Sequence, residues 1–281
     1  YRTTFVPVDR AGRLDLDHLY DNLTDDTAIV SLMWANNETG VIFPVEEVAR
    51  KVKERGIVFH TDAVQAAGKI PIDVGRTGVD MLSLSGHKIH APKGVGVLYL
   101  RKGTRFAPFM VGGHQEKGRR GGTENTAAII GLGKAAELAK RHLDAGAYRY
   151  VAELRDRLEA RLLERVPNTL VNGDRAHRLP NTTSLSFEYV EGESILLMLN
   201  EHGICASSGS ACTSGSLEPS HVLRAMGVPF TAAHGSIRFS LSRYTTGPEI
   251  DRVVETLPPI IARLREMSPF WKGAKLEAHG R

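Results

Sequence analysis

Short apolar segments alternate with helical segments through the first half of the chain, and this alternation limits the possible folds more than any other feature. The segment 44–52 begins with proline and spaces its valines as a helix does. Apolar runs of buried-strand length occupy 28–33, 57–60, 79–84 and 96–100. Buried strands that alternate with helices form a mainly parallel sheet with helices packed on it. The expected fold class is therefore α/β with a mainly parallel sheet.

The second half of the chain has a different pattern, and the change falls near residue 143. Helices are expected over 127–143, 148–166, 193–200 and about 248–267, and strands that alternate polar and apolar residues over 182–187 and 236–241. Such alternation indicates half-exposed strands. We therefore expect two domains: residues 1–143, the remainder of a large domain, and residues 144–281, a smaller α+β domain.

Composition narrows the class of protein. Of the 281 residues, 42% are hydrophobic and 24% are charged, which is typical of a soluble globular protein. No apolar run reaches the roughly 18 residues of a membrane helix, and a net charge of +4 does not indicate nucleic-acid binding. Two cysteines are too few for a disulfide framework and favour a reducing, cytoplasmic location. Because the chain opens at Tyr1 and residues 3–8 are typical of a strand entered midway, we expect an N-terminal portion to be absent.

The first segment with reactive side chains is 59–65. Asp62 comes just after a predicted buried strand, where α/β sheets place residues that contact ligands. Taken alone, an aspartate in this position is more often a helix N-cap.

The second reactive segment is 83–94, which contains two serines, Lys88, His87 and His90. Hydroxyl and imidazole donors beside glycine backbone suit a phosphate, and a lysine there can form a Schiff base. The two histidines are also compatible with a metal site, although no carboxylate or cysteine accompanies them at ligand spacing. A plain surface loop is the other alternative.

The third reactive segment, 206–216, consists of small residues around Cys212. Structural cysteines usually have apolar neighbours, so this pattern favours an exposed and reactive thiol. Cys205 follows Gly203-Ile204 at a predicted strand start, and we expect it to be a small core residue.

Together these segments make the chain resemble the cysteine desulfurases over essentially its whole length, and most closely the nitrogen-fixation (NifS-like) type of the class-V aminotransferases. The matching motifs are 33–40, 60–65, 85–88 with 92–94, 119–125, 212 with 217–221, and 237–241. The resemblance implies an aminotransferase-like fold of pyridoxal phosphate (PLP) fold type I. Residues 1–143 would then bind PLP, and residues 144–281 would carry the catalytic cysteine loop.

The resemblance also implies roles for individual residues. Lys88, rather than the nearby Lys93, would form the Schiff base with PLP, and Cys212 would receive the sulfur. The remaining implied roles are Asp62 at the pyridine nitrogen, Gln65 at the phenolic oxygen, Ser85 and His87 at the phosphate, Thr123 at the phosphate of the partner subunit in a homodimer, and Asn37 with Arg238 at the substrate carboxylate.

The implied reaction converts L-cysteine to L-alanine and passes the sulfur, as a Cys212 persulfide, to a scaffold protein that builds iron–sulfur clusters, here for nitrogenase maturation. No resident metal site is expected, although Cys212 is able to ligate a transferred iron–sulfur cluster. Two alternatives stay open. One is a selenocysteine lyase or another PLP enzyme of the same fold. The other is an inactive fragment, because the family's N-terminal ring-stacking imidazole and phosphate-binding turn have no counterpart in this sequence.

Overall fold

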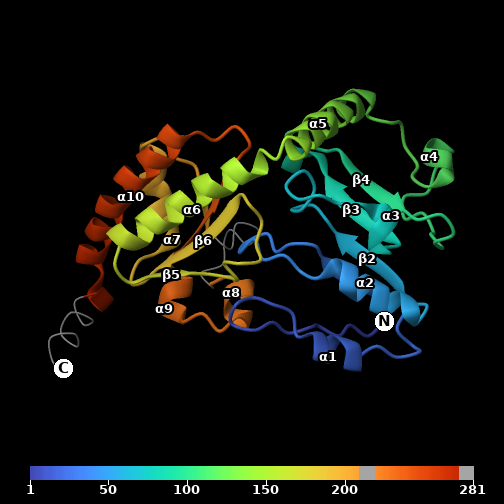
Figure 1. Cartoon of the computed structure of the whole chain (residues 1–281), viewed down its shortest axis with the longest axis horizontal. Coiled ribbons are helices and arrows are strands. Elements are labelled where there is room, and N and C mark those ends of the chain that lie inside the picture. Colours follow the sequence, from blue (N-terminus) through green and yellow to red (C-terminus); the bar gives the residue numbers. More distant parts are fainter. Residues whose placement is uncertain (209–218, 272–281) are drawn as a thin grey trace. The chain divides into compact units, whose positions relative to one another are not determined.

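The computed structural model describes residues 1–208 and 219–271, which fall into two compact units (Figure 1). The parallel unit consists of residues 23–35 and 43–146, and the antiparallel unit consists of residues 1–22, 36–42 and 147–281. Each unit contains one four-stranded sheet. The predicted domain division at residue 143 stays a prediction.

The parallel unit contains a sheet of strand order β1-β2-β3-β4. Its strands are β1 (Ile29–Met33), β2 (Val58–Asp62), β3 (Met81–Ser85) and β4 (Gly96–Leu100), and its helices are α2 (Val45–Glu54), α3 (Val74–Thr77), η1 (Gly86–Ile89), α4 (Gln115–Gly118) and α5 (Thr126–Asp144). The first three strands are parallel and β4 is antiparallel to β3. The predicted α/β class with a mainly parallel sheet is therefore confirmed.

The predicted burial is wrong for β1 and β4. Leu32 is buried, but Ile29 and Met33 of β1 are 49% and 37% exposed, and Leu98 of β4 is 43% exposed. The exposed side chains of β1 point to the face opposite Leu32, because side chains alternate along a strand. Helix α2 packs against β1 and β2, and its buried residues include Val48. An apolar run therefore predicted the strands correctly but not which faces are covered.

The antiparallel unit contains a sheet of order β5-β6-β8-β7. Its strands are β5 (Thr169–Val171), β6 (Thr182–Phe187), β7 (Ser207–Ser208) and β8 (Ser236–Ser240), and its helices are α1 (Leu16–Asp21), α6 (Tyr148–Arg165), α7 (Gly192–Glu201), α8 (His221–Ala225), α9 (Phe230–Ala233) and α10 (Gly247–Met267). Helices α6 and α10 run side by side in Figure 1, and with α7 they enclose the main hydrophobic core against β6 and β8.

Strand β6 is buried along its whole length, so the predicted half-exposed strand is wrong. Leu185 and Phe187 point into the hydrophobic core. On the opposite face, Ser184 and Ser186 accept hydrogen bonds from the Asn172 side-chain amide at 3.1 and 2.8 Å. The two serines made the sequence of β6 alternate like that of a half-exposed strand. Their hydroxyl groups are instead buried, and the hydrogen bonds from the Asn172 amide replace those that water would make.

The start of the chain also differs from the prediction. Residues 3–8 form no strand, and Val8 makes only an isolated bridge with Leu14. Among the described residues, no helix has both the length and the apolar character that crossing a membrane requires.

Candidate active site

Asp62 is the last residue of β2, which lies between β1 and β3 in the parallel part of the sheet. In the sheet register it is opposite Met33 of β1 and Ser83 of β3. Asp62 is exposed, and its Oδ1 accepts a hydrogen bond from the Val64 backbone nitrogen at 2.8 Å. The carboxylate thus fixes the turn after the strand rather than capping a helix. Gln65 lies half-buried in the same turn, at the sheet edge where ligands bind in α/β proteins.

Lys88 and its predicted neighbours follow the next strand. Ser85 ends β3, and η1 carries His87 and Lys88 directly after it. Ser85 Oγ and His87 Nδ1 are hydrogen-bonded at 2.8 Å. Gly86 is required between them, because a Cβ there would lie 2.9 Å from the Val95 side chain and 3.0 Å from the Val95 carbonyl oxygen. Lys88 is half-buried, and no hydrogen bond or ion pair joins its amine to another described residue.

The chemistry of these side chains fits PLP. The Ser85 hydroxyl, the His87 imidazole and the backbone of η1 are of the kind that binds a phosphate. The amine of Lys88 is without a described partner and is therefore available to an aldehyde. Asp62, on the strand paired with β3, supplies a carboxylate of the kind that pairs with a pyridine nitrogen.

His60 links three strands on the sheet face that also carries Asp62. Its Nδ1 lies 2.8 Å from Ser31 Oγ on β1, and its Nε2 lies 2.9 Å from Ser83 Oγ on β3. Burial lowers the pKa of His60, and the charge of Asp62 opposes this with a smaller effect. This role of His60 was not predicted from the sequence. The spacing of His60 and Asp62, two residues apart on one strand, was the signal for a shared face.

Lys69 is a second amine in the parallel unit, and the sequence did not single it out. It ends the turn that begins after Asp62, and its Nζ is buried with no hydrogen-bond partner among the described residues. Burial is the main cause that lowers the pKa of Lys69, to about 8, and the positive charge of Lys88 lowers it further. The amine of Lys69 therefore lies within the electrostatic range of Lys88.

Thr123 lies on an exposed segment before α5. Gly122, its neighbour, has a φ of 107°, and its backbone nitrogen donates to Gln115 Oε1 at 3.2 Å. No described contact joins Thr123 to Lys88 or Ser85. The place of Thr123 in the cofactor site therefore stays a prediction.

Asn37 and Arg238 do come together, in the antiparallel unit. Arg238 lies on β8, and its Nη1 donates to the Asn37 carbonyl oxygen at 2.8 Å. The Arg238 Nε is buried and has no hydrogen-bond partner among the described residues. A buried guanidinium with an unused donor is suited to an added carboxylate. The structure therefore pairs the two residues predicted to bind the substrate carboxylate.

Cys212 lies outside the described residues. Cys205 is exposed, so its prediction as a small core residue is wrong. Its neighbours Ile204 and Ala206 pack against the hydrophobic core, and side chains alternate in extended chain. The side chain of Cys205 therefore points away from the core.

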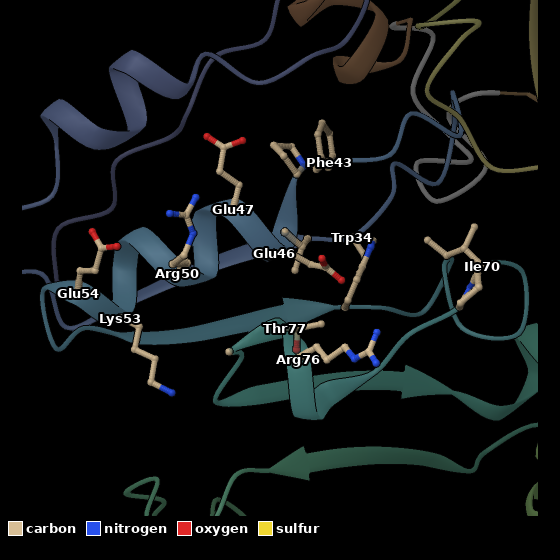
Figure 2. Close-up of a pocket in the computed structure, with 14 residues that line it drawn as sticks. Trp34, Phe43, Glu46, Glu47, Arg50, Lys53, Glu54, Ile70, Arg76 and Thr77 are labelled. Carbon is tan, nitrogen blue, oxygen red and sulfur yellow. The ribbon is translucent and has the colours of Figure 1, made fainter.

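A cavity of the parallel unit does not coincide with these residues. It has a volume of about 1020 Å³ and lies beside α2 and α3 (Figure 2). Trp34, Glu46 and Arg76 are among its lining residues, and none of the predicted site residues is. Its mixed charges give no single ligand chemistry, whereas the segment around Lys88 does. Across residues 1–208 and 219–271, no cluster of three or more histidine, cysteine or acidic side chains is able to hold a metal ion.

Comparison with known proteins agrees with the chemistry of the site. The family model for class-V aminotransferases matches residues 1–253. The chain is 63% identical over 273 residues to a protein named cysteine desulfurase NifS from Azotobacter vinelandii, covering 97% of this chain and 68% of the relative.

Solved structures give the same result. A NifS-like protein is 38% identical with a TM-score of 0.86, covering 94% of this chain and 69% of its own. SspA in complex with cysteine is 32% identical with a TM-score of 0.72, covering 88% of this chain and 68% of its own. The chain therefore belongs to the class-V aminotransferase family, and within it to the cysteine desulfurases.

Proposed function

We propose that this cysteine desulfurase binds PLP through Lys88, holds L-cysteine by its carboxylate with Asn37 and Arg238, and takes up the sulfur on Cys212. The observation that carries this proposal is that β2 and β3 are paired strands. Asp62 is the last residue of β2, and β3 ends at Ser85, directly before the η1 turn that contains Lys88. The names of the relatives favour this activity over a selenocysteine lyase.

The residues of the parallel unit would hold the cofactor. The carboxylate of Asp62 would accept a hydrogen bond from the protonated pyridine nitrogen, and Gln65 would donate to the phenolic oxygen. Ser85 and His87 would donate to the phosphate, and Lys88 would bind the cofactor covalently. When bound, PLP supplies an electron sink for negative charge at the substrate Cα. The amine of Lys88, once released, would accept the Cα proton at Nζ.

The residues of the antiparallel unit would select the substrate. The buried Arg238 Nε, which has no hydrogen-bond partner among the described residues, suits a carboxylate. One of the similar solved structures is SspA in complex with cysteine. The Cys212 thiolate would form an S–S bond with the substrate sulfur while the Cβ–S bond breaks. The electron pair of the broken bond stays on Cβ, which takes up a proton and becomes the methyl group of alanine.

The persulfide on Cys212 needs an acceptor. We propose a cytoplasmic scaffold protein that assembles iron–sulfur clusters, in the service of nitrogenase, because the relative from Azotobacter vinelandii carries the name NifS. We also propose a homodimer in which Thr123 of one subunit reaches the phosphate held by the other. The exposure of Thr123 and the lack of a described contact to Lys88 agree with a role across subunits.

The lysine assignment is tested by absorbance and by borohydride reduction. Lys88→Ala should lose the yellow colour of the cofactor adduct, whereas the matched variant Lys93→Ala should keep it. Reduction followed by peptide mapping should place the label on Lys88. A reduced adduct that persists in Lys88→Ala and maps to Lys93 would overturn the assignment.

The thiol assignment is tested with sulfur-labelled L-cysteine. Cys212→Ala should retain the cofactor spectrum and lose sulfur release. Cys205→Ala should keep activity within a few-fold. Label recovered on Cys205 would show that Cys205, and not Cys212, is the nucleophile.

Sharing of the site is tested with mixed dimers. Lys88→Ala and Thr123→Ala are each expected to be weakly active. When mixed, they should form dimers with one intact site. Absence of recovered activity in verified mixed dimers would contradict a shared site.

A further inference from the structure

We propose that Glu38 is a positioning residue, which holds Asn37 and Arg238 in place through a hydrogen bond from Ser220. The inference rests on the proposed function, because that function gives Asn37 and Arg238 their role at the substrate carboxylate. All four residues lie in the antiparallel unit.

The contact between Glu38 and Ser220 joins two distant parts of the sequence. Each residue is only 4% exposed, and Ser220 Oγ donates to Glu38 Oε2 at 2.5 Å. The same Oγ accepts from the backbone nitrogens of Val222 and Leu223 at 3.1 and 3.4 Å, at the start of α8. The serine hydroxyl is therefore used as donor and as acceptor. No solvent molecule is needed to satisfy it.

The backbone on both sides of Glu38 is fixed as well. Asn36 Oδ1 accepts hydrogen bonds from the backbone nitrogens of Glu38 and Thr39, both at 2.9 Å. Asn37 lies within this turn, and its carbonyl oxygen accepts from Arg238 Nη1. Anchoring the Glu38 side chain therefore fixes the orientation of the carbonyl group that holds Arg238.

Electrostatics argues against a purely stabilising role for Glu38. Burial raises the pKa of Glu38, and the hydrogen bond from Ser220 and the electrostatic interactions with His221 and Arg238 offset this only in part. A buried carboxylate with one hydroxyl partner is a poor source of stability compared with an apolar side chain. Its place next to Asn37 and in the field of Arg238 is better explained by orientation of that pair.

The test compares Ser220→Ala, Glu38→Ala and Glu38→Gln with a control, Glu159→Gln. The control removes another buried carboxylate of the same unit, which binds Arg178 and Thr183. The first readout is amide hydrogen exchange of residues 36–42 and 222–226 in the cofactor-free protein. The second is KM and kcat for L-cysteine in the holoenzyme.

Ser220→Ala should speed exchange in both segments and raise KM about tenfold with a smaller loss of kcat, since a hydrogen bond to a charged group is lost. Glu38→Gln keeps an acceptor oxygen and should stay within about threefold of the wild type. The Glu38→Ala, Ser220→Ala double variant should be no worse than either single variant. Glu159→Gln should lower stability and leave KM unchanged.

Wild-type exchange in residues 36–42 together with wild-type KM in Ser220→Ala would overturn the proposal, as would an equal rise of KM in the control. Failure of the proposed function is a separate result. In that case the wild type would not turn over L-cysteine, but the exchange data would still show whether Glu38 and Ser220 are coupled.

Discussion

Replacing Lys69 by methionine should stabilise the protein at neutral pH. The Nζ of Lys69 is buried without a hydrogen-bond partner among the described residues, so folding removes an ammonium group from water with no described compensation. The pKa of Lys69 falls from its ordinary value of 10.5 to about 8, mainly through burial and then through the charge of Lys88. Methionine has a similar length and carries no charge, so it removes this penalty.

The magnitude and the pH window follow from this pKa. Between about 8 and 10.5 the unfolded chain holds the Lys69 proton and the folded chain has lost it, so the free energy of unfolding rises with pH. Below about 8 both states are protonated, and the whole penalty is present. The difference between the pKa of Lys69 in the unfolded chain and in the folded chain corresponds to a free energy of about 3 kcal/mol. We therefore expect Lys69→Met to add up to about 3 kcal/mol of stability at pH 7 and little above pH 10.5.

The assay is urea unfolding of the cofactor-free protein, followed by circular dichroism from pH 7 to pH 10.5. Lys51 is exposed on α2, so Lys51→Met serves as the matched control. The wild type and the control should gain stability together as the pH rises, while Lys69→Met should gain less. A Lys69→Met variant that is less stable than the wild type at pH 7, or that has an unchanged pH dependence, would refute the reasoning.

Two further predictions concern buried or partly buried charges. Because burial lowers the pKa of His60, stability should fall as the pH drops below about 6.5, and His60→Gln should weaken this dependence in unfolding measurements from pH 5 to pH 7. An unchanged acid dependence would contradict a lowered pKa for the His60 imidazole between Ser31 and Ser83. Glu159→Gln leaves the buried Arg178 without its closest carboxylate and should lower the free energy of unfolding by about 3 kcal/mol. Asp156 Oδ1 lies 3.3 Å from Arg178 Nη2, and a loss below about 1 kcal/mol would show that Asp156 compensates.

Strong local patterns predicted most of the elements. The apolar runs gave β1, β2, β3 and β4 within about three residues. The long helices α5, α6 and α10 were predicted with similar bounds, because the helical spacing of their apolar residues is a property of the local sequence. Short elements such as β5 and α8 were not predicted, since few residues carry too weak a pattern. The residues around Lys88 were recognised because their chemistry is contiguous in the chain.

The errors have a common physical cause. The exposure of a side chain depends on which other residues pack against it, and the polarity of its neighbours in the sequence does not predict those contacts. Cys205 was expected in the core, but it alternates with Ile204 and Ala206, which pack against the core instead. Ser184 was expected on an exposed face, but Asn172 covers it and satisfies its hydroxyl. The burial of Ser184 depends on a residue twelve positions away in the sequence, and the exposure of Cys205 depends on the direction in which its neighbours' side chains point.

The sequence by itself determined the family and the fold class, and it predicted the reactive side chains, because these depend on motifs whose residues are neighbours in the chain. Only the tertiary structure decided how distant residues meet. It paired Arg238 with Asn37, seated Ser220 on Glu38, and buried Lys69 within reach of the charge of Lys88. Hydrogen bonds and electrostatic interactions act over a few ångströms in space, so separation along the chain carries no information about them until the chain has folded.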